Sequence, residues 1–180
     1  MNNKGIAVAI SVAVFVLAGC ATPARIEQMT VSSAGIPTTP APEAVQQNIA
    51  IKDVTGGQET NPLWTSQVSS AEFERALEAS LKAAGLLQPI RTSGRFTLTA
   101  QLAKLDQPLI GLNMTVTASV LYVLVERSTG KTLWEQTLVT PYTAKFGDSL
   151  LAIERLKLAN EGAIRENISA LIAELFRLKL

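Results

Sequence analysis

Residues 47–180 show two periods of apolar positions, and each period predicts one kind of element. A period of two is typical of half-buried strands and indicates four of them, over residues 48–54, 95–104, 112–125 and 132–140. Pro141 follows the fourth strand. Because proline cannot donate a hydrogen bond to a neighbouring strand, it indicates a sheet edge or a strand end.

The remaining apolar positions recur at helical spacing in two segments. The first helix starts at Ser69, where Ser69 and Glu72 form a capping box, and Gly85 is a suitable stop. The second follows Gly147 and carries an apolar stripe towards the end of the chain. Gly162 lies within it and leaves open whether this helix is bent or divided.

The order of these elements is β-α-β-β-β-α. We therefore predict a single α+β domain over residues 47–180, with a mostly antiparallel four-stranded sheet and two helices on one face. The other face of the sheet is expected to be uncovered and polar, and to carry Thr97, Thr99, Gln101, Asn113, Thr115, Thr117 and Ser119.

Residues 1–19 have the three parts of a secretory signal peptide. Lys4 supplies a positive charge, residues 6–17 form a short apolar run, and Ala18 and Gly19 are the small residues of a cleavage site. The run is short for a membrane-spanning helix, which needs about 20 apolar residues. We therefore expect these residues to be removed from the mature protein.

The end of this region, Leu17-Ala18-Gly19-Cys20, resembles the lipobox of bacterial lipoproteins. The resemblance implies a lipoprotein signal peptide cleaved between Gly19 and Cys20, with diacylglycerol on the Cys20 thiol and an acyl chain such as palmitate on the new N-terminus. Because Ala21 and not aspartate follows, the sorting rule of enteric bacteria implies outer-membrane delivery, with the domain on the periplasmic face. An ordinary secretory signal with a chance cysteine is the alternative.

The composition of residues 20–46 predicts a lipid-anchored tether between the membrane and the domain. They hold four prolines, several serines and threonines, and little apolar periodicity. Such a segment is semi-extended, and the 26 residues after Cys20 would span at most about 85 Å. The domain would then stand clear of the membrane.

Composition restricts the chemistry that this chain can perform. It has no histidine, and Cys20 is its one cysteine, so we expect no catalytic triad, no metal site and no cofactor beyond the lipid on Cys20. Removing residues 1–19 takes one of the 16 basic residues and none of the 15 acidic ones, which leaves a formal net charge of zero. Nucleic-acid binding is therefore not expected. The acidic residues of the second helix, Glu154, Glu161 and Glu166, fit a solvated face.

Two apolar loops are candidate contact sites. Leu109 and Ile110 stand where a hairpin tip should be polar, and either they fold back on the core or they contact a partner or lipid. Trp64 lies between the first strand and the first helix, and either it covers the end of the core or it anchors an interface.

The combination of a lipobox, a proline-rich segment and a β-α-β-β-β-α domain resembles small envelope lipoproteins of Gram-negative bacteria. The layout is similar to the LPS-assembly lipoprotein and to YajG-type lipoproteins, and residues 141–146 and 159–168 resemble uncharacterised lipoproteins of this kind. The resemblance implies an envelope location, and it assigns no functional residue beyond Cys20.

We therefore expect an outer-membrane lipoprotein that faces the periplasm and binds an envelope protein as a non-catalytic accessory or structural partner. One alternative is a carrier that holds lipid or lipopolysaccharide between sheet and helices, in a pocket lined by small residues such as Ala100, Ala118 and Ala163. The other is an enzyme whose site the sequence does not reveal.

Overall fold

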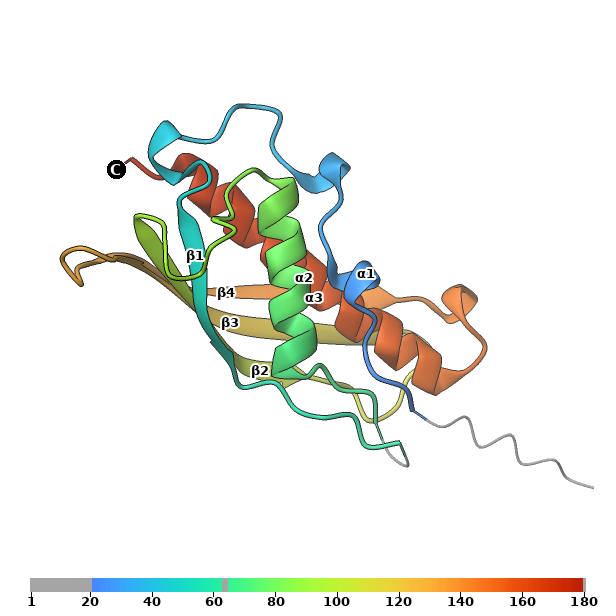
Figure 1. Cartoon of the computed structure of the whole chain (residues 1–180). Coiled ribbons are helices and arrows are strands. Elements are labelled where there is room, and N and C mark those ends of the chain that lie inside the picture. The colour runs from blue at the N-terminus through green and yellow to red at the C-terminus, as the bar shows by residue number, and fades with distance from the viewer. Residues whose placement is uncertain (1–20, 63–64, 180) are drawn as a thin grey trace, which may run out of the picture.

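The computed structural model describes residues 21–62 and 65–179, which form one sheet with helices packed on one of its faces (Figure 1). The predicted order and the α+β class are confirmed. The main elements are β1 (Ile49–Thr55), α2 (Ser70–Ala83), β2 (Phe96–Asp106), β3 (Met114–Glu126), β4 (Thr132–Ala144) and α3 (Ala152–Arg177). A short helix α1 (Ile26–Met29) and two 3-10 turns, η1 (Ser33–Gly35) and η2 (Glu43–Val45), precede them, and η3 (Phe146–Asp148) lies between β4 and α3.

The four strands lie side by side in chain order, β1-β2-β3-β4. β1 and β2 are parallel because α2 crosses over between them, and the other two neighbouring pairs are antiparallel. Pro141 belongs to β4, opposite Thr117 of β3, so the strand continues past the proline instead of stopping there. β4 is an edge strand, which is where proline is tolerated.

α2 begins as its sequence predicts. The Ser69 hydroxyl accepts a hydrogen bond from the Glu72 backbone N–H at 3.2 Å, and the Glu72 carboxylate accepts one from the Ser69 N–H at 2.9 Å. Val68 and Phe73, which stand at the positions of a hydrophobic staple, are both buried in the core.

α3 is one continuous helix, and Gly162 serves packing instead of bending it. A Cβ atom at Gly162 would lie 2.2 Å from Cδ1 of Tyr142 on β4, so only glycine lets the helix approach this ring. One turn later, buried Asn167 accepts a hydrogen bond from the Tyr122 hydroxyl at 2.9 Å and donates to the Leu138 carbonyl at 3.0 Å. α3 is thereby fixed to both β3 and β4.

The uncovered face of the sheet is less polar than predicted. Its threonines and Ser119 are exposed or half-buried, as expected. Asn113 does not belong to it, because it precedes β3 and its side chain accepts a hydrogen bond from the Phe146 N–H at 3.0 Å. Further along β3 and β4, the same face carries Leu121, Val123, Val125 and Val139.

The prediction of an extended tether over residues 20–46 is wrong for 21–46, since this segment packs on the domain. Met29, Val31 and Val45 are buried in the core, and α1 contacts both α2 and α3 (Figure 1). The Ser80 hydroxyl of α2 accepts a hydrogen bond from the Val31 N–H at 2.9 Å. Isolated apolar residues in a proline-containing segment carry no periodicity, yet Met29, Val31 and Val45 are all buried in the core.

Candidate functional site

Large apolar side chains are exposed together at one end of the domain. The loop between β2 and β3 exposes Leu109 by 99% and Ile110 by 88%, and the loop before α3 exposes Leu150 by 81%. We call the whole set the apolar end, and it consists of Leu109, Ile110, Leu112, Phe146, Leu150 and Leu151. Exposed apolar side chains in such number make the apolar end a candidate contact site.

The two loops meet because of the sheet register. β3 begins opposite the end of β4, where Met114 pairs with Ala144, so the loops leave the same end of the sheet. Buried Arg155 of α3 then joins them. It donates hydrogen bonds to the Ser149 carbonyl at 2.7 Å and to the Gly111 carbonyl at 3.5 Å, and its guanidinium lies 5.1 Å from the centre of the Phe146 ring.

The first described residues lie at this same end of the domain (Figure 1). The Ala21 N–H donates a hydrogen bond to the Pro62 carbonyl at 2.9 Å, and Ala21 is buried. The Thr22 carbonyl accepts from the Ser66 hydroxyl at 3.0 Å, and Lys157 of α3 donates to the Thr22 hydroxyl at 2.8 Å. The chain therefore enters the domain at a fixed point.

A buried polar cluster connects this entry point to the apolar end. The Ser66 carbonyl accepts hydrogen bonds from Gln107 Nε2 at 3.0 Å and from Asn160 Nδ2 at 2.9 Å. Gln107 Nε2 also donates to Asn160 Oδ1 at 2.8 Å. Because Ser66 holds Thr22, and Gln107 comes two residues before Leu109, one network positions both features.

Arg25 and Glu161 hold the segment after the entry point. Glu161 is only 1% exposed, and its carboxylate accepts three hydrogen bonds from Arg25, two from the guanidinium at 2.9 Å and one from the backbone N–H at 2.8 Å. The hydrogen bond to Glu161 raises the pKa of Arg25. The expectation that Glu161 belongs to a solvated face is therefore wrong, since a carboxylate with such partners can be buried.

Some of the predicted site residues lie in the described part of the chain and others do not. Leu109 and Ile110 are exposed, so they do not fold back on the core. Gly19, Cys20 and the signal peptide over 1–19 lie outside the described residues, as does Trp64.

The sequence reasoning identified Leu109 and Ile110 but missed the other four residues of the apolar end, and it assigned Leu112 to a strand. Three of these residues, Phe146, Leu150 and Leu151, precede α3, which begins at Ala152. Because the helix was predicted to start after Gly147, the two leucines were assigned to it. The available signal was the pair Leu150-Leu151, which stands outside the apolar stripe of the helix. That the two loops meet could be seen only from the strand register.

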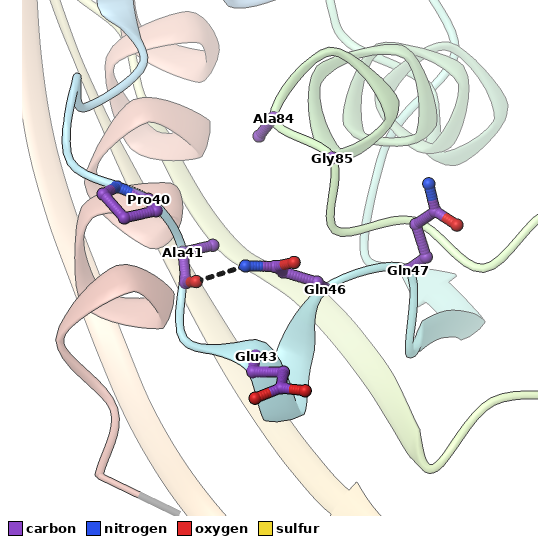
Figure 2. Close-up of a pocket in the computed structure, with 7 residues that line it drawn as sticks. All are labelled: Pro40, Ala41, Glu43, Gln46, Gln47, Ala84 and Gly85. Atoms are coloured by element: carbon purple, nitrogen blue, oxygen red, sulfur yellow. Dashed lines mark hydrogen bonds between the residues drawn. The ribbon is translucent and has the colours of Figure 1, made fainter.

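A separate open pocket of about 540 Å³ lies where the segment before β1 passes the end of α2. Among the described residues that line it, Glu43 is the one titratable side chain, and Figure 2 shows Glu43 at the bottom of the view and Gln47 at the right. The Gln46 amide donates a hydrogen bond to the Ala41 carbonyl at 2.6 Å. The described residues that line this pocket include no second acidic or basic side chain, so they do not form a pair of groups for acid–base chemistry.

The other predicted features can be placed as well. The three alanines suggested for a lipid pocket, Ala100, Ala118 and Ala163, are buried in the hydrophobic core. Over residues 21–62 and 65–179, no group of three or more acidic or cysteine side chains is placed to hold a metal ion. No helix in this part of the chain is long and apolar enough to cross a membrane.

Comparison with known proteins gives a likeness in structure alone. No protein-family model and no curated protein matches the sequence. The structure is similar to protein XCC0632 from Xanthomonas campestris, of family DUF330, with a TM-score of 0.63 and 13% identity over 87% of this chain and 95% of that one.

Two further solved structures show more distant likeness. The PelC dodecamer from Paraburkholderia phytofirmans has a TM-score of 0.50 and 16% identity over 78% of this chain and 96% of that one. A minor lipoprotein from Acinetobacter baumannii has a TM-score of 0.48 and 10% identity over 74% and 94%. At these identities the likeness concerns the fold, and the fold of this chain is that of XCC0632.

Proposed function

We propose that this protein is a lipoprotein of the Gram-negative envelope, anchored through an acylated Cys20 and acting by binding, without catalysis. It is delivered to the outer membrane, faces the periplasm and serves as an accessory or structural partner of an envelope complex. The resemblance of Leu17-Ala18-Gly19-Cys20 to a lipobox supports the envelope location.

One observation carries the proposal: the residues that directly follow the predicted cleavage point are docked on the domain. Ala21, the residue after Cys20, is buried and hydrogen-bonded, and Thr22 is bonded to both Ser66 and Lys157. Cleavage between Gly19 and Cys20 would therefore leave the whole described structure intact. A cleavage point inside the docked segment would instead remove buried contacts of α1.

The uncovered face of the sheet is our proposed contact for a protein partner. It combines threonines, which can donate and accept hydrogen bonds, with Leu121, Val123 and Val139. β4 borders it with a free edge, since this strand pairs only with β3 among the described strands. A mixed surface of this kind fits a non-obligate protein contact, whose composition differs little from ordinary surface.

The anchor is tested on protein purified from bacterial membranes. Mass spectrometry of the N-terminal peptide should find Cys20 as the first residue, carrying diacylglycerol and an amide-linked acyl chain. The Cys20→Ala variant should keep residues 1–19 and carry no lipid. A wild-type chain cleaved elsewhere, or a Cys20 without lipid, would overturn the proposal.

The binding role is tested by crosslinking in living cells from single positions that carry a photoreactive amino acid. We expect position 139 on the sheet to give one dominant crosslinked protein, and position 59, an exposed glutamate in the loop before α2, to give none. Recovery of the lipoprotein alone with a co-purified lipid would favour the carrier alternative. A band made of two copies of this chain would indicate self-assembly, the arrangement that the PelC dodecamer has.

A further inference from the structure

We infer that the apolar end inserts into the lipid bilayer beside the anchor, so that the protein has a second membrane contact which fixes its orientation. This inference rests on the proposed lipidation of Cys20. It assigns Leu109, Ile110, Leu112, Phe146, Leu150 and Leu151 to lipid contact and leaves the sheet for a protein partner.

The position of the chain entry is the first reason. Neighbouring Cα atoms are about 3.8 Å apart, so an acylated Cys20 cannot move away from Ala21. Ala21 and Thr22 are in turn fixed to the loop over 60–67 and to α3. Without a free tether, the lipid holds this end of the domain at the membrane surface.

The link between the entry point and the loops is the second reason. Thr22 binds Ser66, and Ser66 binds Gln107, which comes two residues before Leu109. The loop that carries Leu109 and Ile110 therefore cannot turn far from the anchor. Arg155 joins the loop before α3 to the same position through the Ser149 and Gly111 carbonyls.

The chemistry of the side chains favours lipid over water. Leucine and isoleucine side chains exposed by 81–99% in water lose free energy when they enter an apolar phase. The neighbouring charges are balanced in number, since Lys104 pairs with Asp106 at 3.0 Å and Lys145 stands three residues before Asp148. Insertion should therefore depend on apolar contact and little on salt.

The test uses the lipidated, mature protein in vesicles of phosphatidylethanolamine and phosphatidylglycerol. Acylation occupies the thiol of the one native cysteine, so Leu109→Cys or Leu150→Cys supplies a single site for a polarity-sensitive fluorophore. The matched control is Ile90→Cys, an apolar residue that is 59% exposed near the opposite end of β2. Mass spectrometry of the N-terminal peptide of each sample establishes that Cys20 is acylated.

We expect labels at 109 and 150 to emit at shorter wavelength in vesicles and to be quenched by lipids that carry a quencher. The label at 90 should be quenched by aqueous iodide instead. In a Leu109→Ser/Ile110→Ser background, the label at 150 should lose most of its lipid quenching, while Val139→Ser should leave it unchanged. The quenching should vary less than twofold between low and high salt, as apolar insertion is not screened.

Three results would contradict the inference, and they separate it from the proposed function. If Cys20 is acylated but the labels at 109 and 150 respond only to iodide, the apolar end does not insert and the anchor proposal stands. If these labels are protected only in native envelopes that contain other proteins, a protein covers the apolar end. If Cys20 carries no acyl group, the proposed function and the inference that rests on it both fail.

Discussion

Lys157 of α3 donates a hydrogen bond of 2.8 Å to the hydroxyl of Thr22, a residue 135 positions earlier in the chain. The same ammonium group pairs with Glu154 at 2.9 Å, which offsets the cost of holding Lys157 almost fully buried. Because Thr22 is the second residue after Cys20, this contact determines where the chain leaves the domain. If Cys20 is acylated as proposed, the docking of residues 21–31 sets how the domain is held at the membrane.

Replacing Arg25 should destabilise the domain more than replacing its ion-pair partner Glu161. Arg25→Ala leaves a buried carboxylate with one backbone donor and should lower the free energy of unfolding by about 2–3 kcal/mol. Glu161→Gln keeps an acceptor and frees an arginine that is already 46% exposed, so it should cost about 1 kcal/mol.

Urea unfolding of the purified protein measures both changes. Arg177→Ala is the control, because its pair with Glu174 is exposed and should be worth less than about 0.5 kcal/mol. Limited proteolysis should cut the Arg25→Ala variant between residues 21 and 31 sooner than wild type. Equal stability of Arg25→Ala and Arg177→Ala would mean that the Arg25–Glu161 pair contributes no more than an exposed ion pair.

Gly162→Ala should destabilise the domain even though alanine is the better helix former by about 1 kcal/mol. The new Cβ would lie 2.2 Å from Cδ1 and 2.3 Å from Cγ of the Tyr142 ring. Forcing the helix and strand apart should cost about 1–3 kcal/mol net. Gly147→Ala meets no atom within 4 Å and should change stability by less than about 0.5 kcal/mol.

Thermal unfolding of the two alanine variants gives this comparison directly. A double variant, Gly162→Ala with Tyr142→Ala, should lose less stability than the sum of its single changes, because the ring that clashes is gone. Strict additivity would show that the two residues are not in contact.

The Tyr122 hydroxyl should make stability depend on alkaline pH. Burial raises the pKa of Tyr122 above its ordinary value of 10.0, so its contribution is complete below pH 10 and is lost as pH rises further. At pH 7, Tyr122→Phe should cost about 1 kcal/mol, because it removes the hydrogen bond to Asn167. At pH 11, ionisation of Tyr122 in the unfolded wild-type chain should lower the wild-type free energy of unfolding by about 1.4 kcal/mol, which is enough to offset the hydrogen bond.

Urea unfolding of wild type and Tyr122→Phe at pH 7 and pH 11 shows which protein is the more stable at each pH. The variant should be the less stable protein at pH 7 and should equal or exceed wild type at pH 11. A difference that stays constant between the two pH values would mean that Tyr122 ionises as easily in the folded protein as in the unfolded one.

The apolar end should contribute nothing to folding. Leu109→Ser with Ile110→Ser should change the free energy of unfolding by less than about 0.5 kcal/mol, because both side chains are exposed. Leu98→Ala, in the core strand beside β1 and β3, should cost about 2–5 kcal/mol. Calorimetry of the two variants distinguishes them, and a large loss in the serine variant would mean that these side chains pack on the domain.

Much of the fold could be predicted because its signals are local. The capping box of Ser69 and Glu72 placed the start of α2 correctly, and the alternation in β2 and β3 indicated which face is buried. The exposed pair Leu109 and Ile110 could be identified as well, since apolar residues at a hairpin tip break the pattern around them.

The docked segment could not be predicted, because its contacts are made with partners far away in the chain. Met29 and Val31 look like isolated apolar residues among prolines, and Glu161 looks like one more charge on a helix. Each becomes buried only when α2 and α3 lie on the sheet and leave sites that fit them. The choice of glycine at 162 likewise depends on a ring supplied by β4.

The sequence by itself thus determined the elements, the buried face of the sheet and the LAGC pattern at Cys20, because each depends on residues close together in the chain. Only the tertiary structure decided that the chain enters the domain beside the loops of Leu109 and Leu150. That arrangement depends on strand register and on hydrogen bonds between Thr22, Ser66 and Gln107, which join distant segments. Local pattern carries no information about such contacts, since they arise from how the helices and the sheet pack together.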